Sequence, residues 1–164
     1  MQKKRGQLQI SFGMIFSIII IVATLAVAGY VLVKFVDFGS RVSCKLYYND
    51  LQERIDRAWK SDGSTSDIFQ GTIPRGVEQV CFGSIGLSAD AQDRNEQEEL
   101  RFYADEQNNL FFYPPEKNAC GADSFVYIIK HVSMQKFFCV PARNGKAEVK
   151  ISKGSTETLV TLAP

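Results

Sequence analysis

The stretch that decides the fold is ISFGMIFSIIIIVATLAVAGYVLV, residues 10–33, which contains 24 residues and no charged side chain. A helix rises about 1.5 Å per residue, so this stretch would extend about 36 Å. That length exceeds the hydrocarbon core of a bilayer, which is about 30 Å thick. We therefore expect a transmembrane helix over residues 9–35.

Two other interpretations of the stretch are open. A cleaved signal peptide has an apolar core of about 7–15 residues that ends at a small-x-small site. Ala26-Val27-Ala28 has that form, but the apolar stretch is longer and continues to Lys34. A buried helix of a soluble protein is the second alternative, and 24 residues that are apolar on every face are too many for it. A retained transmembrane helix fits best.

Positive charge sets the expected orientation. Lys3, Lys4 and Arg5 lie directly before the apolar stretch, whereas charges after it are sparser. Lys and Arg beside a membrane-spanning helix stay on the cytoplasmic side. We therefore expect residues 1–8 in the cytoplasm and the residues after about 38 outside the cell. The expected location is the cell membrane, crossed once, with membrane lipid as a partner.

All the cysteines fall on the expected outer side, at Cys44, Cys81, Cys120 and Cys139. An even number of cysteines in an exported segment indicates disulfides. Two bridges can connect four cysteines in three ways, and the sequence does not choose among them. Zinc ligation is a weaker interpretation than disulfides. Zinc sites use close pairs such as C-x-x-C, whereas the gaps here are 37, 39 and 19 residues. Buried free thiols are a further alternative.

The residues after the apolar stretch predict a membrane-proximal amphipathic helix over residues 36–63. Four apolar side chains recur at steps of 3, 4 and 4, which places them on one helical face. They are Tyr48, Leu51, Ile55 and Trp59. We expect this face to pack on the chain's own domain, and contact with neighbouring subunits is the alternative. We expect a kink or pause at Gly39-Ser40, and the end of the helix at Ser61-Asp62-Gly63.

Residues 64–164 are expected to form a β-rich extracytoplasmic head. The turn Pro74-Arg75-Gly76 predicts a hairpin between a strand at 68–73 and another at 77–82. Asn144-Gly145 is a strong turn signal, and the alternation after it predicts a half-solvated strand over 147–151. Further strands are expected at 110–113, 125–129, 136–140 and 158–162, with a short helix or an edge strand at 96–103. The expected fold class is α+β, with a mainly antiparallel sheet against the helix at 44–60.

The sequence lacks motifs for catalysis or cofactor binding. It contains no P-loop, G-x-G-x-x-G, H-E-x-x-H or G-x-S-x-G, and its single histidine, His131, lies in no local motif. We interpret Glu96, Glu98 and Glu99 as a solvated acidic face. Residues 34–164 carry 16 Lys and Arg against 18 Asp and Glu, so no basic field favours nucleic acid. We expect no enzymatic activity, cofactor, metal or nucleic-acid partner.

The start of the chain resembles archaeal membrane-anchored proteins with pilin-type (class III) signals. In such signals, basic residues and a glycine or alanine precede a glutamine-rich start, and the apolar helix that follows is kept after cleavage. Here Lys3-Lys4-Arg5 and Gly6 precede Gln7, so the resemblance implies leader processing at Gly6 and Gln7. The residues Gln9-Ile10-Ser11-Phe12-Gly13 are similar to the Q-x-S-x-E motif of archaeal pilins. Gly13 stands at the position of the glutamate.

The chain also resembles a set of small archaeal single-pass proteins at 9–17 and 80–82. An apolar half-helix, an amphipathic half-helix and a sheet-rich head form the pilin plan. The resemblance implies a non-enzymatic surface protein of pilin-like architecture that assembles with its own copies or with other pilin-like subunits. The alternative is a tethered binding or accessory module that is neither processed nor polymerised. An enzyme would need a cleft that unites His131 with carboxylates or a cysteine.

Overall fold

The computed structural model describes residues 12–117, 119–121 and 124–164. The predictions for residues 1–8, including the processing residues Gly6 and Gln7, lie outside the described residues. The fold is α+β, with an apolar helix near the amino terminus and mainly antiparallel strands after it. The chain divides into two compact units, Met1–Val36 and Asp37–Pro164.

The first unit contains the amino-terminal part of helix α1, which begins at Phe12 and ends at Lys60. Its segment Gly13–Phe35 has a mean hydropathy of 2.7, and all of its side chains are exposed. Among the described helices, this segment alone has the length and composition needed to cross a membrane. Large apolar side chains exposed over several turns indicate contact with lipid or with another protein.

Helix α1 continues through Gly39 and Ser40, so the helix does not pause there. A glycine inside a helix costs about 1 kcal/mol relative to alanine, which is too little to interrupt a long helix. The end of the helix agrees with the predicted stop signal. The backbone N–H of Ser61 donates to the Ala58 carbonyl at 3.3 Å, and the Ser61 hydroxyl donates to the same oxygen at 2.7 Å.

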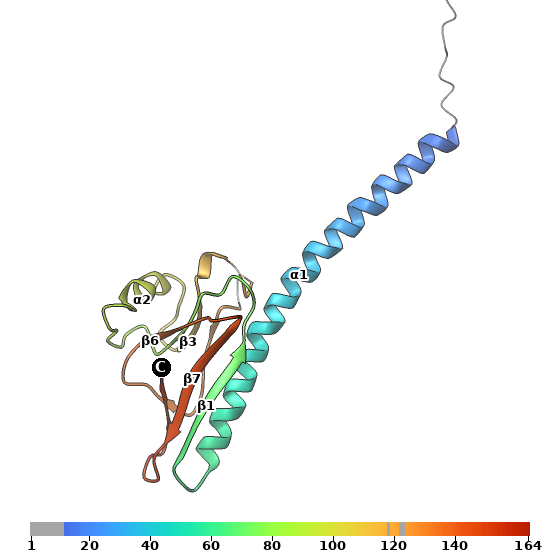
Figure 1. The fold of residues 1–164 in the computed structure, drawn as a ribbon. Helices are drawn as coiled ribbons and strands as arrows, with labels where there is room; N and C mark the ends of the chain where they lie inside the picture. Colours follow the sequence, from blue (N-terminus) through green and yellow to red (C-terminus); the bar gives the residue numbers. More distant parts are fainter. Residues whose placement is uncertain (1–11, 118, 122–123) are drawn as a thin grey trace, which may run out of the picture. The chain divides into compact units, whose positions relative to one another are not determined.

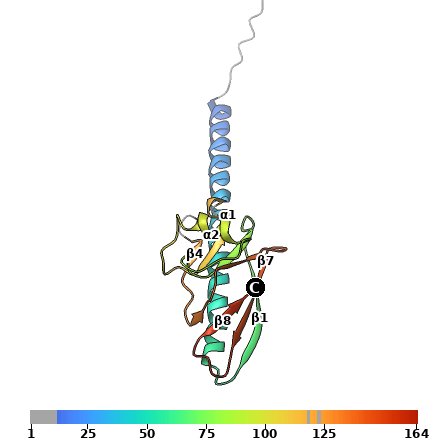
Figure 2. The same ribbon diagram turned by 90° about the vertical axis from the view of Figure 1, so that its left-hand side faces the viewer.

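In the described part of the second unit, the strands form two four-stranded sheets rather than the expected single sheet (Figures 1 and 2). The first has the order β1-β7-β8-β5, with β1 at Thr65–Thr72, β7 at Lys146–Lys153, β8 at Val160–Ala163 and β5 at Val132–Ser133. The second has the order β4-β3-β2-β6, with β4 at Val126–Tyr127, β3 at Leu110–Tyr113, β2 at Gln79–Phe82 and β6 at Phe138–Pro141. Two short helices complete the unit, α2 at Arg94–Leu100 and the 3-10 helix η1 at Pro115–Lys117. The described strand pairs are antiparallel except for β5 with β8.

The predicted hairpin around Pro74-Arg75-Gly76 is wrong. Strand β1 pairs with β7 over all eight of its residues, whereas β2 pairs with β3 and β6 in the other sheet. The turn therefore carries the chain from one sheet to the other. The physical reason is that a turn signal reports a change of direction but not which strand pairs next. The distant β7 offers β1 a longer ladder than the four-residue β2 could.

Other strand predictions agree with the structure. Asn144 and Gly145 have φ values of 53° and 71°, and Arg143 and Lys146 exchange two backbone hydrogen bonds across them, at 2.8 and 3.0 Å. This geometry is the two-residue hairpin turn that Asn-Gly favours. Strand β7 then alternates exposed and buried side chains, as predicted. The segment 96–103, left open between helix and strand, begins within α2.

The core of the second unit lies between α1 and the two sheets. Cys44, Tyr47, Leu51 and Ile55 are completely or almost completely buried on one face of α1. The Tyr47 ring meets Phe69 of β1 and Phe112 of β3 edge to face, with centroids 5.2 and 5.6 Å apart. Because Phe69 and Phe112 belong to different sheets, this one helical face joins both sheets into a single core.

Candidate functional site

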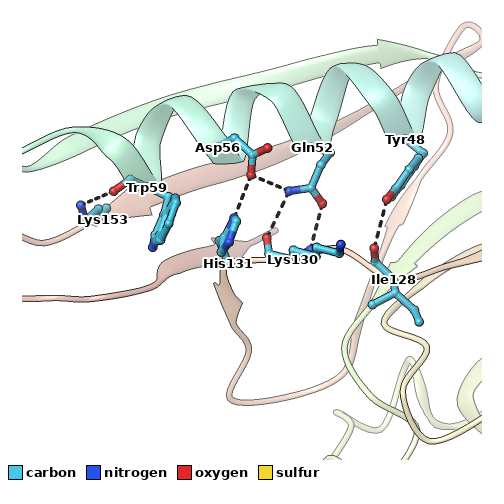
Figure 3. Close-up of polar contacts among 8 residues, drawn as sticks. All are labelled: Tyr48, Gln52, Asp56, Trp59, Ile128, Lys130, His131 and Lys153. Atoms are coloured by element: carbon cyan, nitrogen blue, oxygen red, sulfur yellow. Dashed lines mark hydrogen bonds and ion pairs between the residues drawn. The ribbon is translucent and has the colours of Figure 1, made fainter.

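A row of polar and aromatic side chains on α1 faces the loop before β5, as Figure 3 shows. The row consists of Tyr48, Gln52, Asp56 and Trp59, whose spacings of 4, 4 and 3 place them on one side of the helix. The loop contributes Ile128, Lys130 and His131. We call this set the α1–loop contact.

Backbone groups of the loop are paired with side chains of α1. The Tyr48 hydroxyl donates to the Ile128 carbonyl at 3.2 Å. The Gln52 amide bonds to both backbone groups of Lys130: it accepts from the N–H at 2.9 Å and donates to the carbonyl at 3.3 Å. Since unpaired backbone groups near a protein interior are unfavourable, these bonds fix the loop on the helix without a strand pairing.

Asp56 and Trp59 hold the imidazole of His131. A carboxylate can only accept, so His131 Nδ1 carries the proton and donates to Asp56 Oδ1 at 2.9 Å. The hydrogen bond from His131 lowers the pKa of Asp56, and a second bond from Gln52 Nε2 at 2.8 Å lowers it further against the opposing effect of burial. The Trp59 ring stacks on the imidazole with centroids 3.8 Å apart and planes 3° from parallel. His131 has a φ of 64°, a left-handed backbone that this packing supports.

A lysine of β7 caps the carboxyl end of α1. Lys153 Nζ donates to the carbonyl oxygens of Trp59 and Ser61, both at 2.7 Å. The last carbonyls of a helix have no partner within the helix and carry partial negative charge, so a lysine there is favourable. The α1–loop contact therefore lies beside a helix end that is itself anchored to the first sheet.

The arrangement holds the loop before β5 in position on α1. A histidine whose Nδ1–H is held by a carboxylate keeps Nε2 as an acceptor, which is half of a general-base arrangement. Among the described residues, however, no group of three or more His, Cys, Asp or Glu side chains could hold a metal ion. The hydrogen bond to Asp56 and the stacking on Trp59 explain how His131 holds the loop on α1.

The predicted packing residues take different positions. Leu51 and Ile55 are fully buried, Tyr48 is half-buried, and Trp59 is 37% exposed at the edge of the α1–loop contact. Periodicity missed Cys44 and Tyr47, which continue the buried face of Leu51 and Ile55 at steps of 3 and 4. It also missed Gln52 and Asp56, because polar side chains at helical spacing look the same whether they face water or a loop.

Both pairs of cysteines form disulfides. Cys44 of α1 bonds to Cys120, and Cys81 of β2 bonds to Cys139 of β6. The first bridge ties the helix to the segment before β4. The second joins residues directly opposite each other in neighbouring strands. This is one of the three connections that the sequence left open.

The acidic residues 96–99 are only partly a solvated face. Glu96 Oε1 accepts from Gln79 Nε2 at 3.1 Å, and Glu99 Oε2 accepts from the Tyr113 hydroxyl at 2.6 Å. The bond to Glu99, together with burial, raises the pKa of Tyr113 to about 12. Glu98 is exposed. Two of the three carboxylates therefore hold α2 on the second sheet.

Comparison with models of protein families, with curated proteins and with solved structures finds no match to this chain.

Proposed function

We propose that the protein is a non-enzymatic, single-pass membrane-anchored surface protein of pilin-like architecture. The observation that carries the proposal is the unequal environment of α1. Its Gly13–Phe35 segment is apolar and exposed throughout, whereas Cys44, Tyr47, Leu51 and Ile55 are buried by the strands. A helix of this kind suits an anchor for a folded head, which we define as residues 37–164.

The proposed orientation places the amino terminus in the cytoplasm and the head outside the cell. Two arguments support it. Lys3, Lys4 and Arg5 would stay on the cytoplasmic side of the membrane. The disulfides Cys44–Cys120 and Cys81–Cys139 persist in oxidising compartments rather than in the cytosol.

The proposed partners are membrane lipid and other copies of the chain or other pilin-like subunits. The resemblance of the start of the chain to pilin-type signals supports assembly into a filament or a surface array after processing between Gly6 and Gln7. In this proposal the α1–loop contact shapes the head, and His131 positions the loop instead of catalysing a reaction.

The membrane anchor can be tested by alkaline extraction of cell membranes with a matched pair of variants. Val22→Arg places a charge in the middle of the apolar segment, and Ile68→Arg places the same charge at an exposed apolar position on β1. An arginine at the centre of a membrane helix is unfavourable by about 2.5 kcal/mol or more. We expect Val22→Arg to lose protein from the extracted membrane and Ile68→Arg to retain it. Release of the unsubstituted chain from the membrane by alkaline extraction would overturn the anchor.

Processing and assembly need separate measurements. Mass spectrometry of the membrane-extracted protein identifies its first residue, and a mature chain that begins at Gln7 supports the pilin-type signal. An intact 1–6 segment removes the processed version and favours the tethered accessory module. Chemical crosslinking in membranes is expected to yield oligomers, and monomers alone would argue against assembly.

A further inference from the structure

We propose that Phe102 and Tyr103 enter the interfacial layer of the membrane that the apolar segment of α1 crosses. The surface consists of Arg101–Tyr103, which we call the aromatic turn, and its partner is a lipid bilayer. The inference rests on the proposed function, because it requires Gly13–Phe35 to lie in a membrane.

The aromatic rings of the turn are exposed, and backbone hydrogen bonds fix the turn that carries them. Phe102 is 87% exposed, more than any other large apolar side chain among the described residues, and Tyr103 is 49% exposed. Three backbone hydrogen bonds of 3.0–3.3 Å continue from α2 through Arg101, Phe102 and Tyr103. Leu100, directly before the turn, is fully buried. The outward position of Phe102 therefore follows from a turn anchored in the core.

A short series of contacts connects the aromatic turn to Arg41 of α1. The Tyr103 ring meets the Phe125 ring edge to face, with centroids 5.8 Å apart. The neighbouring Ser124 donates its N–H to the Gly121 carbonyl at 3.1 Å. The Arg41 side chain covers Gly121 so closely that a Cβ there would lie 2.9 Å from Arg41 Cγ. The Cys44–Cys120 disulfide holds the same segment on α1.

Arg41 cannot be far from the membrane if Phe35 ends the membrane-spanning segment. The two residues are six positions apart, which is about 9 Å along a helix and at most about 20 Å for an extended chain. The headgroup layer on each side of the hydrocarbon core is about 5–8 Å thick. The contacts described above therefore attach the aromatic turn to a segment of α1 that chain length keeps within about 20 Å of the end of the membrane-spanning segment.

The side chains of the aromatic turn have the chemistry of a membrane interface. Aromatic rings, Tyr and Trp above all, are enriched where hydrocarbon meets headgroups. The exposed Arg101 can keep its charge among the headgroups while its stem lies along apolar surface. Transfer of the Phe102 ring from water into this layer is favourable. A bilayer is therefore the occupant that both the position and the chemistry of the turn support.

The test uses tryptophan as a depth probe in the full chain. Trp59 is the single tryptophan and is first replaced by phenylalanine, which preserves an aromatic ring against His131. Phe102→Trp and Ile68→Trp are then made separately in this background. Ile68 is a matched control, because it is 67% exposed and follows Asp67, which pairs with Arg54 at 3.0 Å. Arg54 lies thirteen residues beyond Arg41, about 20 Å further along α1.

Each variant is reconstituted into phosphatidylcholine vesicles, with or without lipid brominated close to the headgroup, and recovered by flotation. We expect both variants to float with the vesicles. The emission of Phe102→Trp should shift to the blue relative to Ile68→Trp, and brominated lipid should quench it. The emission of Ile68→Trp should resemble that of an indole in water in both preparations.

Three other outcomes are distinguishable. If both variants float and neither is quenched, the membrane contact of the aromatic turn is overturned and the anchor stands. If the emission of Phe102→Trp shifts to the blue without quenching by lipid, the turn contacts protein and the inference is wrong. If the chain does not float, the proposed function fails and the inference fails with it.

Discussion

The imidazole of His131 lies flat on the indole of Trp59, with ring centroids 3.8 Å apart and planes 3° from parallel. These are the single histidine and the single tryptophan of the chain. The pair joins the loop before β5 to the last turns of α1, and Asp56 fixes the proton on the imidazole nitrogen that faces it. The fluorescence of Trp59 therefore reports on the α1–loop contact.

Removal of the His131 imidazole should change the fluorescence of Trp59. The two rings are stacked with centroids 3.8 Å apart, so the imidazole is part of the immediate surroundings of the indole. We expect His131→Asn to shift the emission spectrum of the full chain in detergent, and asparagine is chosen because it tolerates the left-handed backbone at this position. Identical emission spectra of the two proteins would contradict the stacked pair.

The carboxylate of Asp56 should stabilise the fold until strong acid protonates it. Because the bond from His131 lowers the pKa of Asp56, folding favours the charged form over the unfolded chain, where the pKa is about 3.9. The stabilisation is present above that value and is lost as the pH falls through the lower folded value. We expect Asp56→Asn to unfold at lower urea concentration than the parent at pH 7, and the difference to shrink below pH 4. A pH-independent difference would contradict this assignment.

Tyr47→Phe, which removes the hydroxyl of Tyr47, should not lower the free energy of unfolding. In the described part of the chain this buried hydroxyl has no hydrogen-bond partner, and burial raises the pKa of Tyr47. Loss of an unpaired buried polar group is neutral or favourable. Tyr113→Phe is the matched control, since it removes a bond to Glu99 and should cost about 1 kcal/mol. Urea unfolding of the two variants measures the difference, and equal losses would show that the Tyr47 hydroxyl is paired.

Gly71 should resist substitution, because it makes room for the Tyr47 ring. A Cβ at Gly71 would lie 2.6 Å from Tyr47 Cε2 and 2.9 Å from Phe69 Cε1. We expect Gly71→Ala to lower the free energy of unfolding by about 1–3 kcal/mol, as overpacked cores do. Gly86→Ala is the control, because no atom outside its neighbours lies within 4 Å of that Cβ. Similar stabilities of the two variants would place Tyr47 elsewhere.

The two disulfides should each stabilise the second unit. They close sequence separations of 76 and 58 residues, and loss of a native disulfide typically costs about 2–5 kcal/mol. Non-reducing digestion and mass spectrometry should yield Cys44 linked to Cys120 and Cys81 linked to Cys139. Peptides that join Cys44 to Cys81 or to Cys139 would contradict the connectivity. Replacement of both cysteines of one bridge by serine should lower the urea midpoint of unfolding, and we expect this result for each of the two bridges.

Local sequence patterns account for part of the candidate site. The repeat of apolar residues correctly indicates that Leu51 and Ile55 share a face of α1, but it adds Trp59, whose ring lies at an edge against His131. Gln52 and Asp56 escape such a pattern, because a polar residue reveals its partner only when the loop is in place. His131 is remote from them by 75 positions or more, so nothing near it in the sequence indicates a clamp.

The sequence by itself determines features that depend on neighbouring residues. These are the apolar segment of α1, the Asn144-Gly145 turn and the alternation of β7, because hydropathy, left-handed backbone and a period of two are local properties. Only the tertiary structure decides that β1 pairs with β7, that Cys44 meets Cys120 and that His131 stacks on Trp59. Those partners are chosen when α1 and two sheets bury their apolar faces together, so the choice depends on many distant contacts at once.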